Sequence, residues 1–388
     1  MAKKKPAATG RVRLGMVGGG QGAFIGAVHR LAARMDDQYE FVAGALSSDA
    51  ARAKASGAEL NLAPDRIYTD YREMAKAEAA REDGIEVVSI VTPNHMHVPV
   101  CKAFVEAGIH VICDKPLAFT LKEAKQLDAL LKKKPGVIFG LTHNYSGYPM
   151  IRQAKEMIAA GELGDIRYVQ AEYAQGWLAT DLEKTGQKQA SWRTDPKQSG
   201  AGGAVGDIGT HAMQLASFVT GLSPVELSAD LTSFVKGRKL DDNVSVLLRF
   251  KGGAKGMLWA SQIAIGNENA LTLRIYGTKG GLDWAQENPN YLGFTELGKP
   301  RTILTRGGAG AGPAASRVTR VPFGHPEGYL EGFANIYTEA ARAIVAARSG
   351  KKPPKEVTFP GIADGVAGMA FIEACVKSSA KNGKWTKV

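Results

Sequence analysis

The chain has 388 residues, long enough for two domains, and its 44% hydrophobic and 22% charged residues exclude a mainly disordered chain, a coiled coil and a disulfide scaffold. The net charge of +11 by itself suggests a nucleic-acid-binding protein, but nine basic residues lie in the stretches 1–13 and 377–388, which hold no acidic residue. Removing these nine leaves +2 for the rest of the chain, so we expect no nucleic-acid partner. Glycine is in excess, with 46 residues, and indicates tight turns or close backbone contacts.

Cysteine spacing and hydropathy indicate which cellular compartment to expect for this protein. The three cysteines, Cys101, Cys113 and Cys375, show no CxxC or zinc-ligand spacing, which favours a reducing compartment. Residues 1–10 lack the apolar core of a signal peptide, and no stretch of about 18 apolar residues could span a bilayer. We therefore expect a cytoplasmic protein without a membrane partner.

The N-terminal segment predicts a dinucleotide-binding unit. A short apolar strand over residues 13–17 runs into a glycine turn, a helix to about residue 35 and a second strand over 41–46. The turn matches G-x-G-x-x-A, although a shifted register is open, and glycines there let backbone N–H groups approach a pyrophosphate. The residues expected to bind the cofactor here are Gly18, Gly20, Gln21, Gly22, Ala23 and Phe24.

The end of the second strand bears on the choice between NAD and NADP. Ser47 stands where such folds usually place an acid for the ribose hydroxyls, and Asp49 comes two residues later. Ser47, Ser48 and Arg52 could accept a 2′-phosphate, whereas Asp49 could simply cap the helix that starts at Ala50. Either NAD or NADP is therefore expected as the cofactor.

Strand and helix signals continue to alternate. Strands are predicted over 85–91, 109–113 and 137–141, with helices over 98–107 and 122–131, so the first half should form a parallel sheet covered by helices. Ligands of such sheets bind beyond the carboxyl ends of the strands. Two polar segments lie at such ends, TPNHMH over residues 92–97 and DKP over 114–116.

The second half changes pattern. Strand-like runs occur over 167–173, 225–233, 244–250, 256–263 and 271–276, and no long helix separates the last four, as in hairpin meanders. A helix is predicted over 209–219. Asp207 and His211 lie four residues apart at its start, so both side chains could point to one ligand.

The glycine turn, TPNHMH, CDKP and the segment GAVGDIGTH over 203–211 occur in an order and spacing that resemble the glucose–fructose oxidoreductase, inositol dehydrogenase and rhizopine-catabolism (Gfo/Idh/MocA) family. DKP stands where that family usually has EKP, and the glycine turn carries extra residues before His29. The resemblance implies an α/β chain: a Rossmann NAD(P)-binding domain over 11–145, then an α+β domain over 146–388 with an open, mostly antiparallel sheet. This second domain would bind substrate and form a homodimer or homotetramer.

The resemblance also implies catalytic roles. Lys115, at the mouth of a strand and followed by Pro116, would stabilise the developing alkoxide of a substrate hydroxyl. His211 would be the general acid/base, and Asp207 would hold a substrate hydroxyl or tune the histidine. Three alternatives are a helix cap for Asp207, a core position for His211, and a metal pair. No further ligands recur at suitable spacing, so we expect no metal.

Further residues are expected near cofactor or substrate by the same resemblance. His95 would lie near the nicotinamide ribose, and His143 is a weaker pocket candidate. Asn94 and His97 would lie near that ribose too, although Asn94 could instead form an Asx turn and His97 could begin the next helix. The cofactor-binding residues expected in these segments are Thr92, Pro93, Asn94, His97 and Lys115. The substrate candidates are Tyr145, Trp192, Arg193 and His325; Trp192 could instead anchor the polar loop that holds it.

The expected function is oxidation, or the reverse reduction, of a secondary alcohol on a sugar, sugar derivative or cyclitol by hydride transfer to NAD or NADP. Two alternatives are an NAD-dependent glycosidase of the same family and a non-catalytic nucleotide-sensing regulator. The intact Lys115, Asp207 and His211 argue against the regulator. Motifs leave the particular substrate and the physiological direction open.

Overall fold

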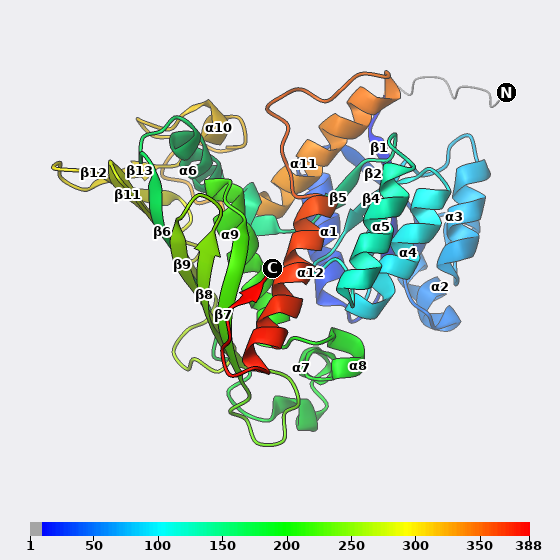
Figure 1. Cartoon of the computed structure of the whole chain (residues 1–388). Helices are drawn as coiled ribbons and strands as arrows, with labels where there is room; N and C mark the ends of the chain where they lie inside the picture. The colour runs from blue at the N-terminus through cyan, green and yellow to red at the C-terminus, as the bar shows by residue number, and fades with distance from the viewer. Residues whose placement is uncertain (1–9) are drawn as a thin grey trace. The chain divides into compact units, whose positions relative to one another are not determined.

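The computed structural model describes residues 10–388 (Figure 1). Part of the basic N-terminal stretch, residues 1–9, lies outside this description. The chain divides into two compact units. The first unit comprises the chain up to Ala118 together with Lys122–Thr142 and Phe333–Val366; the second comprises Phe119–Leu121, His143–Gly332 and Ala367–Val388.

The first unit is built on a parallel sheet. In the described residues its five strands are β1 (Val12–Gly18), β2 (Tyr39–Ala45), β3 (Val87–Val91), β4 (His110–Cys113) and β5 (Phe139–Leu141), in the order β2-β1-β3-β4-β5. Every pair is parallel. Strand order therefore reverses between β1 and β3, which is where open α/β sheets bind ligands.

Helices connect these strands: α1 (Phe24–Met35), α2 (Ala50–Glu59), α3 (Tyr71–Ala80), α4 (Asn94–Glu106) and α5 (Leu121–Lys132). All positions of β3 are buried and both α1 and α4 contact this strand, as expected of a sheet covered on both faces. The predicted parallel α/β architecture is confirmed.

Helix α11 (Tyr329–Arg348) is distant in sequence but packs in the first unit from Phe333 onward. The hydroxyl of Tyr337 lies 2.8 Å from His29 Nδ1 and 2.8 Å from Ser89 Oγ, and all three side chains are buried. Burial lowers the pKa of His29 to about 4, so this histidine is neutral at pH 7. A buried polar network thus joins α1, β3 and α11.

The second unit contains a large mixed sheet. Its nine strands in the described chain, in spatial order β13-β12-β11-β10-β6-β9-β8-β7-β14, pair antiparallel except for β6 with β9. The open, mostly antiparallel sheet expected from the resemblance is therefore confirmed. The strands are β6 (Ile166–Ala174), β7 (Pro224–Thr232), β8 (Asn243–Phe250), β9 (Lys255–Ser261), β10 (Ala270–Gly277), β11 (Gly280–Ala285), β12 (Tyr291–Glu296), β13 (Thr302–Thr305) and β14 (Thr386–Lys387).

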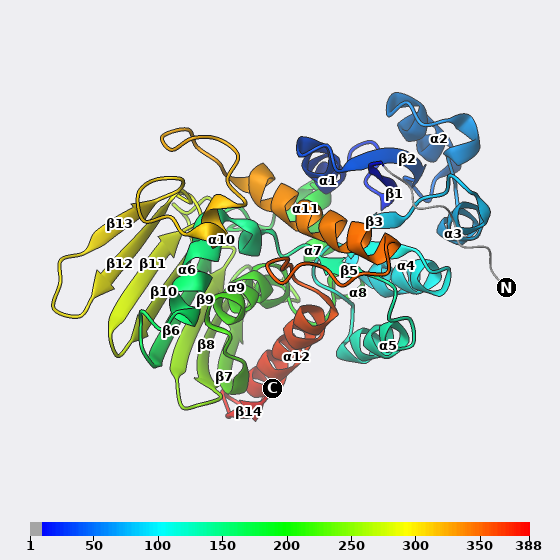
Figure 2. The ribbon, with the colours of Figure 1, turned by 90° about the horizontal axis from the view of Figure 1, so that it is seen from above.

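Helices cover one face of this sheet. Along β8, Val244, Val246 and Leu248 are buried while Ser245 and Leu247 between them are exposed, the alternation of a sheet packed on one side. Helices α6 (Pro149–Ala159) and α9 (Thr210–Thr220) contact the sheet, and α12 (Ile362–Ser379) follows later in the chain (Figure 2). The short helices are α7 (Lys188–Arg193), α8 (Pro196–Ser199) and α10 (Pro313–Ser316).

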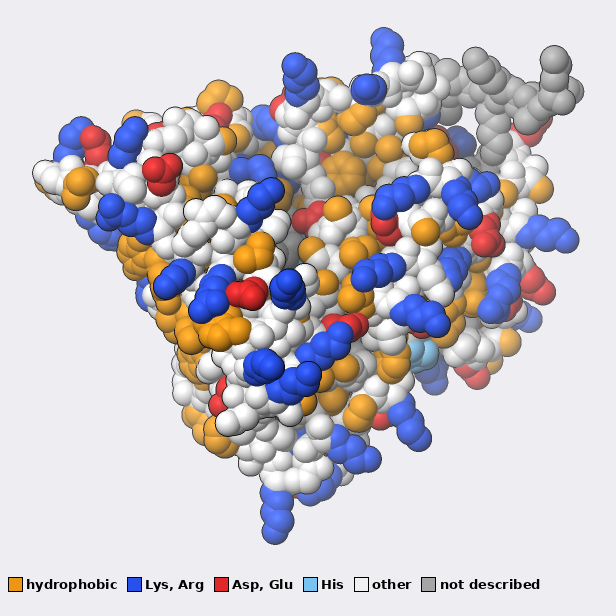
Figure 3. Space-filling view, viewed as in Figure 1, with side chains coloured by type: hydrophobic (Ala, Val, Ile, Leu, Met, Phe, Trp, Pro, Cys, Tyr) orange, Lys and Arg blue, Asp and Glu red, His pale blue; other side chains and the backbone are white. Residues whose placement is uncertain are grey.

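Surface charge and hydropathy complete the description. Lysine and arginine side chains are spread over the face drawn in Figure 3, interspersed with acidic side chains, and do not form one basic patch there. Among residues 10–388, none of the helices combines the length and apolarity needed to cross a bilayer.

Candidate active site

The glycine turn lies between β1 and α1. Gly26, in the first turns of α1, packs so closely on Gly19 that a Cβ at position 26 would lie 2.4 Å from the Cα and the carbonyl oxygen of Gly19. The sequence assigned this close-packing position of the fingerprint to Ala23. Ala23 instead precedes the helix as its N-cap, so the structure corrects the register: the residue that brings helix and turn together is Gly26.

The turn fits a dinucleotide pyrophosphate. Gly22 has a φ of 74°, and a Cβ there would meet nothing within 4 Å, so the backbone at this point faces open space. The N-terminus of α1 carries no side-chain cap and no acidic residue in its first turn, which leaves it suited to an anion. Gln21 is held by α2, because its amide donates to Ser56 and its side chain to Glu59.

The structure decides between the two roles open to Asp49. Asp49 Oδ1 accepts a hydrogen bond from the Arg52 amide at 2.7 Å and caps α2, so the capping alternative is confirmed. Ser47 Oγ accepts from the Asp49 amide at 3.1 Å. Ser48 and the Arg52 side chain are exposed at the end of β2, and their predicted contact with a cofactor stays a prediction.

TPNHMH follows β3. Helix α4 begins at Asn94, earlier than predicted, so Asn94 is a buried helical residue, His95 is exposed, and Pro93 is the N-cap. Thr92 Oγ1 is buried and has no hydrogen-bond partner in the described chain. An orphaned hydroxyl at the carboxyl end of a central strand is consistent with a ligand that completes its hydrogen bonding.

His97 lies in the first turn of α4, in line with the alternative that it begins this helix, and its predicted contact with a cofactor stays a prediction. Its Nδ1 lies 2.7 Å from the carbonyl oxygen of Pro116 and its Nε2 lies 2.8 Å from that of Thr92. Both polar atoms of the ring are thus used within the protein. Burial lowers the pKa of His97, and Asp114 and the two carbonyls partly offset this.

Asp114, Lys115 and Pro116 form the turn after β4. Asp114 Oδ1 accepts hydrogen bonds from the Lys115 amide at 2.9 Å and from Thr142 Oγ1 at 2.8 Å. Because Thr142 directly follows β5, Asp114 ties the turn to the neighbouring strand. Lys115 itself is half-buried at this edge of the sheet.

In the second unit, Asp207 lies in a π-helical turn, Val205–Gly209, that leads into α9. Asp207 Oδ2 accepts from Arg193 Nε at 3.1 Å and from Gln262 Nε2 at 2.9 Å. No side-chain cap is formed at this helical turn, so the helix-cap alternative is wrong. Gln262, directly after β9, is a site residue that the sequence did not indicate.

His211 is buried in a cluster of rings. His143 Nδ1 lies 3.4 Å from His211 Nδ1, and the rings of Tyr145 and Tyr173 lie with centroids 4.9 Å and 6.2 Å from that of His211. Tyr145 and Tyr173 share a hydrogen bond between their hydroxyls, and Tyr173 donates to Asn269 Oδ1 at 2.7 Å. Burial raises the pKa of both tyrosines, so they remain neutral hydrogen-bonding groups.

Trp192 and Arg193 lie in helix α7 and not in the loop that the sequence predicted. The Arg193 guanidinium lies 4.2 Å above the centre of the Trp192 ring and donates to Gln189 Oε1 at 2.6 Å. Together with its bond to Asp207, these contacts make Arg193 the link between α7 and the start of α9.

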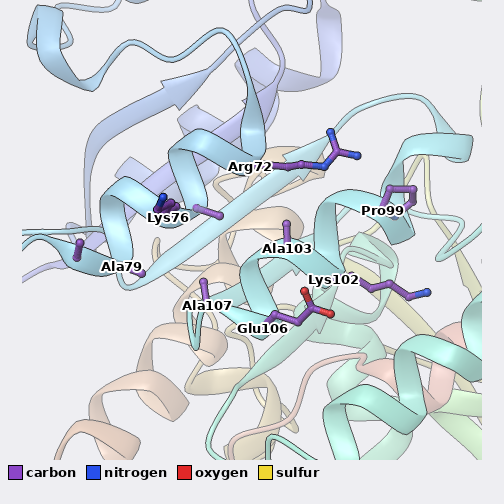
Figure 4. A pocket seen from close by; sticks show the side chains of 10 residues that line it. Arg72, Lys76, Ala79, Pro99, Lys102, Ala103, Glu106 and Ala107 are labelled. Atoms are coloured by element: carbon purple, nitrogen blue, oxygen red, sulfur yellow. The ribbon is translucent and has the colours of Figure 1, made fainter. Parts of the chain in front are cut away.

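His325 is exposed, and its carbonyl oxygen accepts a hydrogen bond from Arg306. Its main chain is therefore held while its ring faces solvent. A separate groove lies between α3 and α4, and none of the predicted site residues lines it (Figure 4). Its lining is a mixture of alanines with Arg72, Lys76, Lys102 and Glu106.

Comparison with known proteins follows the same division of the chain. Residues 12–143 match the model of an oxidoreductase family with an NAD-binding Rossmann fold, and residues 151–283 match that of the GFO/IDH/MocA C-terminal domain. The chain belongs to the Gfo/Idh/MocA oxidoreductase family. It is an NAD-binding oxidoreductase, as the resemblance predicted.

Several relatives are similar over most of their length. An oxidoreductase from Sinorhizobium meliloti is 56% identical, with a TM-score of 0.88, over 97% of this chain and 99% of that one. An inositol dehydrogenase homolog from Azotobacter vinelandii, complexed with NAD+, is 37% identical with a TM-score of 0.93 over the whole of both chains. A further structure from that organism holds NADH and myo-inositol. The levoglucosan dehydrogenase of Pseudarthrobacter phenanthrenivorans is 30% identical over 72% of this chain and 75% of its own.

Proposed function

We propose that this member of the family is a dehydrogenase that oxidises, or in reverse reduces, a secondary alcohol of a sugar, sugar derivative or cyclitol. The observation that carries the proposal is the fixed carboxylate of Asp207, held by Arg193 and Gln262 in the same helical stretch as the buried His211. The relatives named for inositol and levoglucosan support this class of substrate.

The cofactor would be held by the turn from Gly18 to Ala23, by Ser47 and by Thr92. When bound, the nicotinamide accepts the hydride. Because Asp49 is engaged as a helix cap and Ser47 replaces the acid usual at this strand end, NADP should be accepted beside NAD.

The side chains of the chain supply the proton chemistry. His211 takes the proton of the substrate hydroxyl, and Lys115 donates a hydrogen bond to the oxygen and stabilises its developing negative charge. The Asp207 carboxylate, which forms an ion pair with the Arg193 guanidinium, would hold a substrate hydroxyl or tune the histidine. Tyr145, which packs against His211, and Trp192, which packs against Arg193, would bind the remaining hydroxyls and the apolar face of the ring.

A homodimer or homotetramer would form through the open face of the second sheet. Strand register places Leu247, Tyr276 and Ile303 on the same face, opposite the helices, and each is roughly half exposed (53%, 45% and 54%). Exposed apolar side chains on one sheet face are typical of a subunit interface. Sedimentation of the wild type and of Leu247→Asp measures the oligomeric state directly.

The test of the activity is a screen of sugars and cyclitols with NAD and NADP, following the absorbance of the reduced cofactor. With the best substrate, Lys115→Ala should lower kcat by about 10²–10⁴-fold while NADH affinity, measured by fluorescence, is kept. Lys125→Ala, at an exposed position of α5, is the matched control and should behave as wild type.

Two results would contradict the proposal. Turnover retained in Lys115→Ala would remove that lysine from the chemistry. Release of a sugar from a glycoside with no net accumulation of NADH would identify the glycosidase instead.

A further inference from the structure

We propose that His97 is a positioning residue that holds the cofactor-binding segment after β3 at a fixed spacing from the turn that carries Lys115. Thr92 belongs to the first of these segments and Pro116 to the second. The carbonyl oxygens of these two residues lie 2.8 Å and 2.7 Å from the two ring nitrogens of His97. The inference deepens the proposed function and rests on it for the role of Lys115 and for cofactor binding at Thr92.

Each ring nitrogen of His97 faces a carbonyl oxygen, and each contact is a hydrogen bond when that nitrogen carries the proton. A carbonyl oxygen only accepts hydrogen bonds, and an imidazole donates from a nitrogen only when that nitrogen is protonated. Burial lowers the pKa of His97, with Asp114 and the two carbonyls partly offsetting it, so near neutral pH the ring is mainly neutral and donates to one carbonyl in each of its two tautomers. The ring is 1% exposed, so water does not replace either contact easily.

The position of His97 in the fold explains why one ring can reach both segments. Strands β3 and β4 are parallel neighbours, so their carboxyl ends meet at the same edge of the sheet. Helix α4 starts at Asn94, directly after the end of β3, and its first turn turns His97 back toward both ends. The orphaned hydroxyl of Thr92 indicates that the first of these segments meets a ligand.

Two conservative substitutions separate the two contacts. The amide nitrogen of asparagine occupies about the place of Nδ1 and can still donate to Pro116, whereas that of glutamine reaches about as far as Nε2 and can still donate to Thr92. His97→Asn should therefore weaken NADH binding more than it lowers kcat. His97→Gln should lower kcat more than it weakens NADH binding. His97→Phe keeps a ring and removes both donors, so it should impair both quantities.

The experiment measures the Kd of NADH by fluorescence titration and kcat with the best alcohol from the screen, for wild type and the three variants. Losing one buried hydrogen bond should change the affected quantity about tenfold. The Kd of NADH should therefore change more than kcat in His97→Asn, and kcat should change more than the Kd in His97→Gln. A general loss of structure would move both variants alike, which this comparison detects.

Either of two results overturns the inference: equal effects of the asparagine and glutamine variants, or wild-type values for His97→Phe. Wild type without turnover on any sugar or cyclitol would refute the proposed function alone. In that case the NADH titration still decides, because a Kd raised by His97→Asn and not by His97→Gln supports the role of His97, and equal Kd values refute it.

Discussion

Gly26→Ala sets helix propensity against close packing in the glycine turn. In an open helix, alanine is more stable than glycine by about 0.5–1 kcal/mol. At Gly26 the new Cβ would lie 2.4 Å from two backbone atoms of Gly19, whereas an ordinary contact is at least 3.4 Å. Since neither backbone atom can rotate away, overpacking should cost about 1–3 kcal/mol and exceed the gain in propensity. Helix α1 must then move away from the turn.

The expected result is a free energy of unfolding lowered by about 1–2 kcal/mol and weaker NADH binding, measured by urea unfolding and by fluorescence titration. Gly368→Ala in α12 is the matched control, because the nearest heavy atom to its new Cβ, Thr210 Cγ2, is 4.0 Å away. That variant should be as stable as wild type or more so, with unchanged NADH affinity. If Gly26→Ala proved as stable as Gly368→Ala and bound NADH as tightly as wild type, the assignment of Gly26 to the close contact would be wrong.

Two further predictions concern buried polar groups. Tyr337→Phe leaves two buried partners of the hydroxyl with fewer hydrogen bonds and should cost about 1–3 kcal/mol of unfolding free energy, while the exposed Tyr276→Phe should change it by less than about 0.5 kcal/mol; equal thermal shifts would contradict this. Burial raises the pKa of Asp241 to about 6, so the folded protein binds the proton of this carboxyl more tightly than the unfolded chain does. The stability gained from that proton is complete below the pKa of the unfolded chain and is lost as the pH rises through 6. Wild type should therefore gain about 1 kcal/mol relative to Asp241→Asn between pH 7 and pH 5, and urea midpoints that differ by the same amount at both pH values would exclude this titration.

Prediction from sequence worked where local pattern decides the structure. The strands of the first unit and β6 to β10 were predicted because apolar runs and turn residues mark them, and the helix around His211 was found by the same means. The strands β11 to β14 were missed because they are short, and β14 in addition pairs with β7, which is distant in sequence. Helix α7 was missed because it has only six residues, too few for a clear helical periodicity in the sequence.

The candidate site shows the same division between what the sequence predicts and what the tertiary structure decides. The sequence determined that Asp114, Lys115, Asp207 and His211 lie at the ends of elements, because hydrophobic periodicity and turn chemistry fix where each element stops. Only the tertiary structure decided what each polar side chain contacts. The Asp207 carboxylate was shown to be held by Gln262, 55 residues away, and the ring of His97 to contact carbonyls 5 and 19 residues distant. Such partners are set by how separate segments pack, and a buried polar group must find its partner there, so no local pattern in the sequence contains this information.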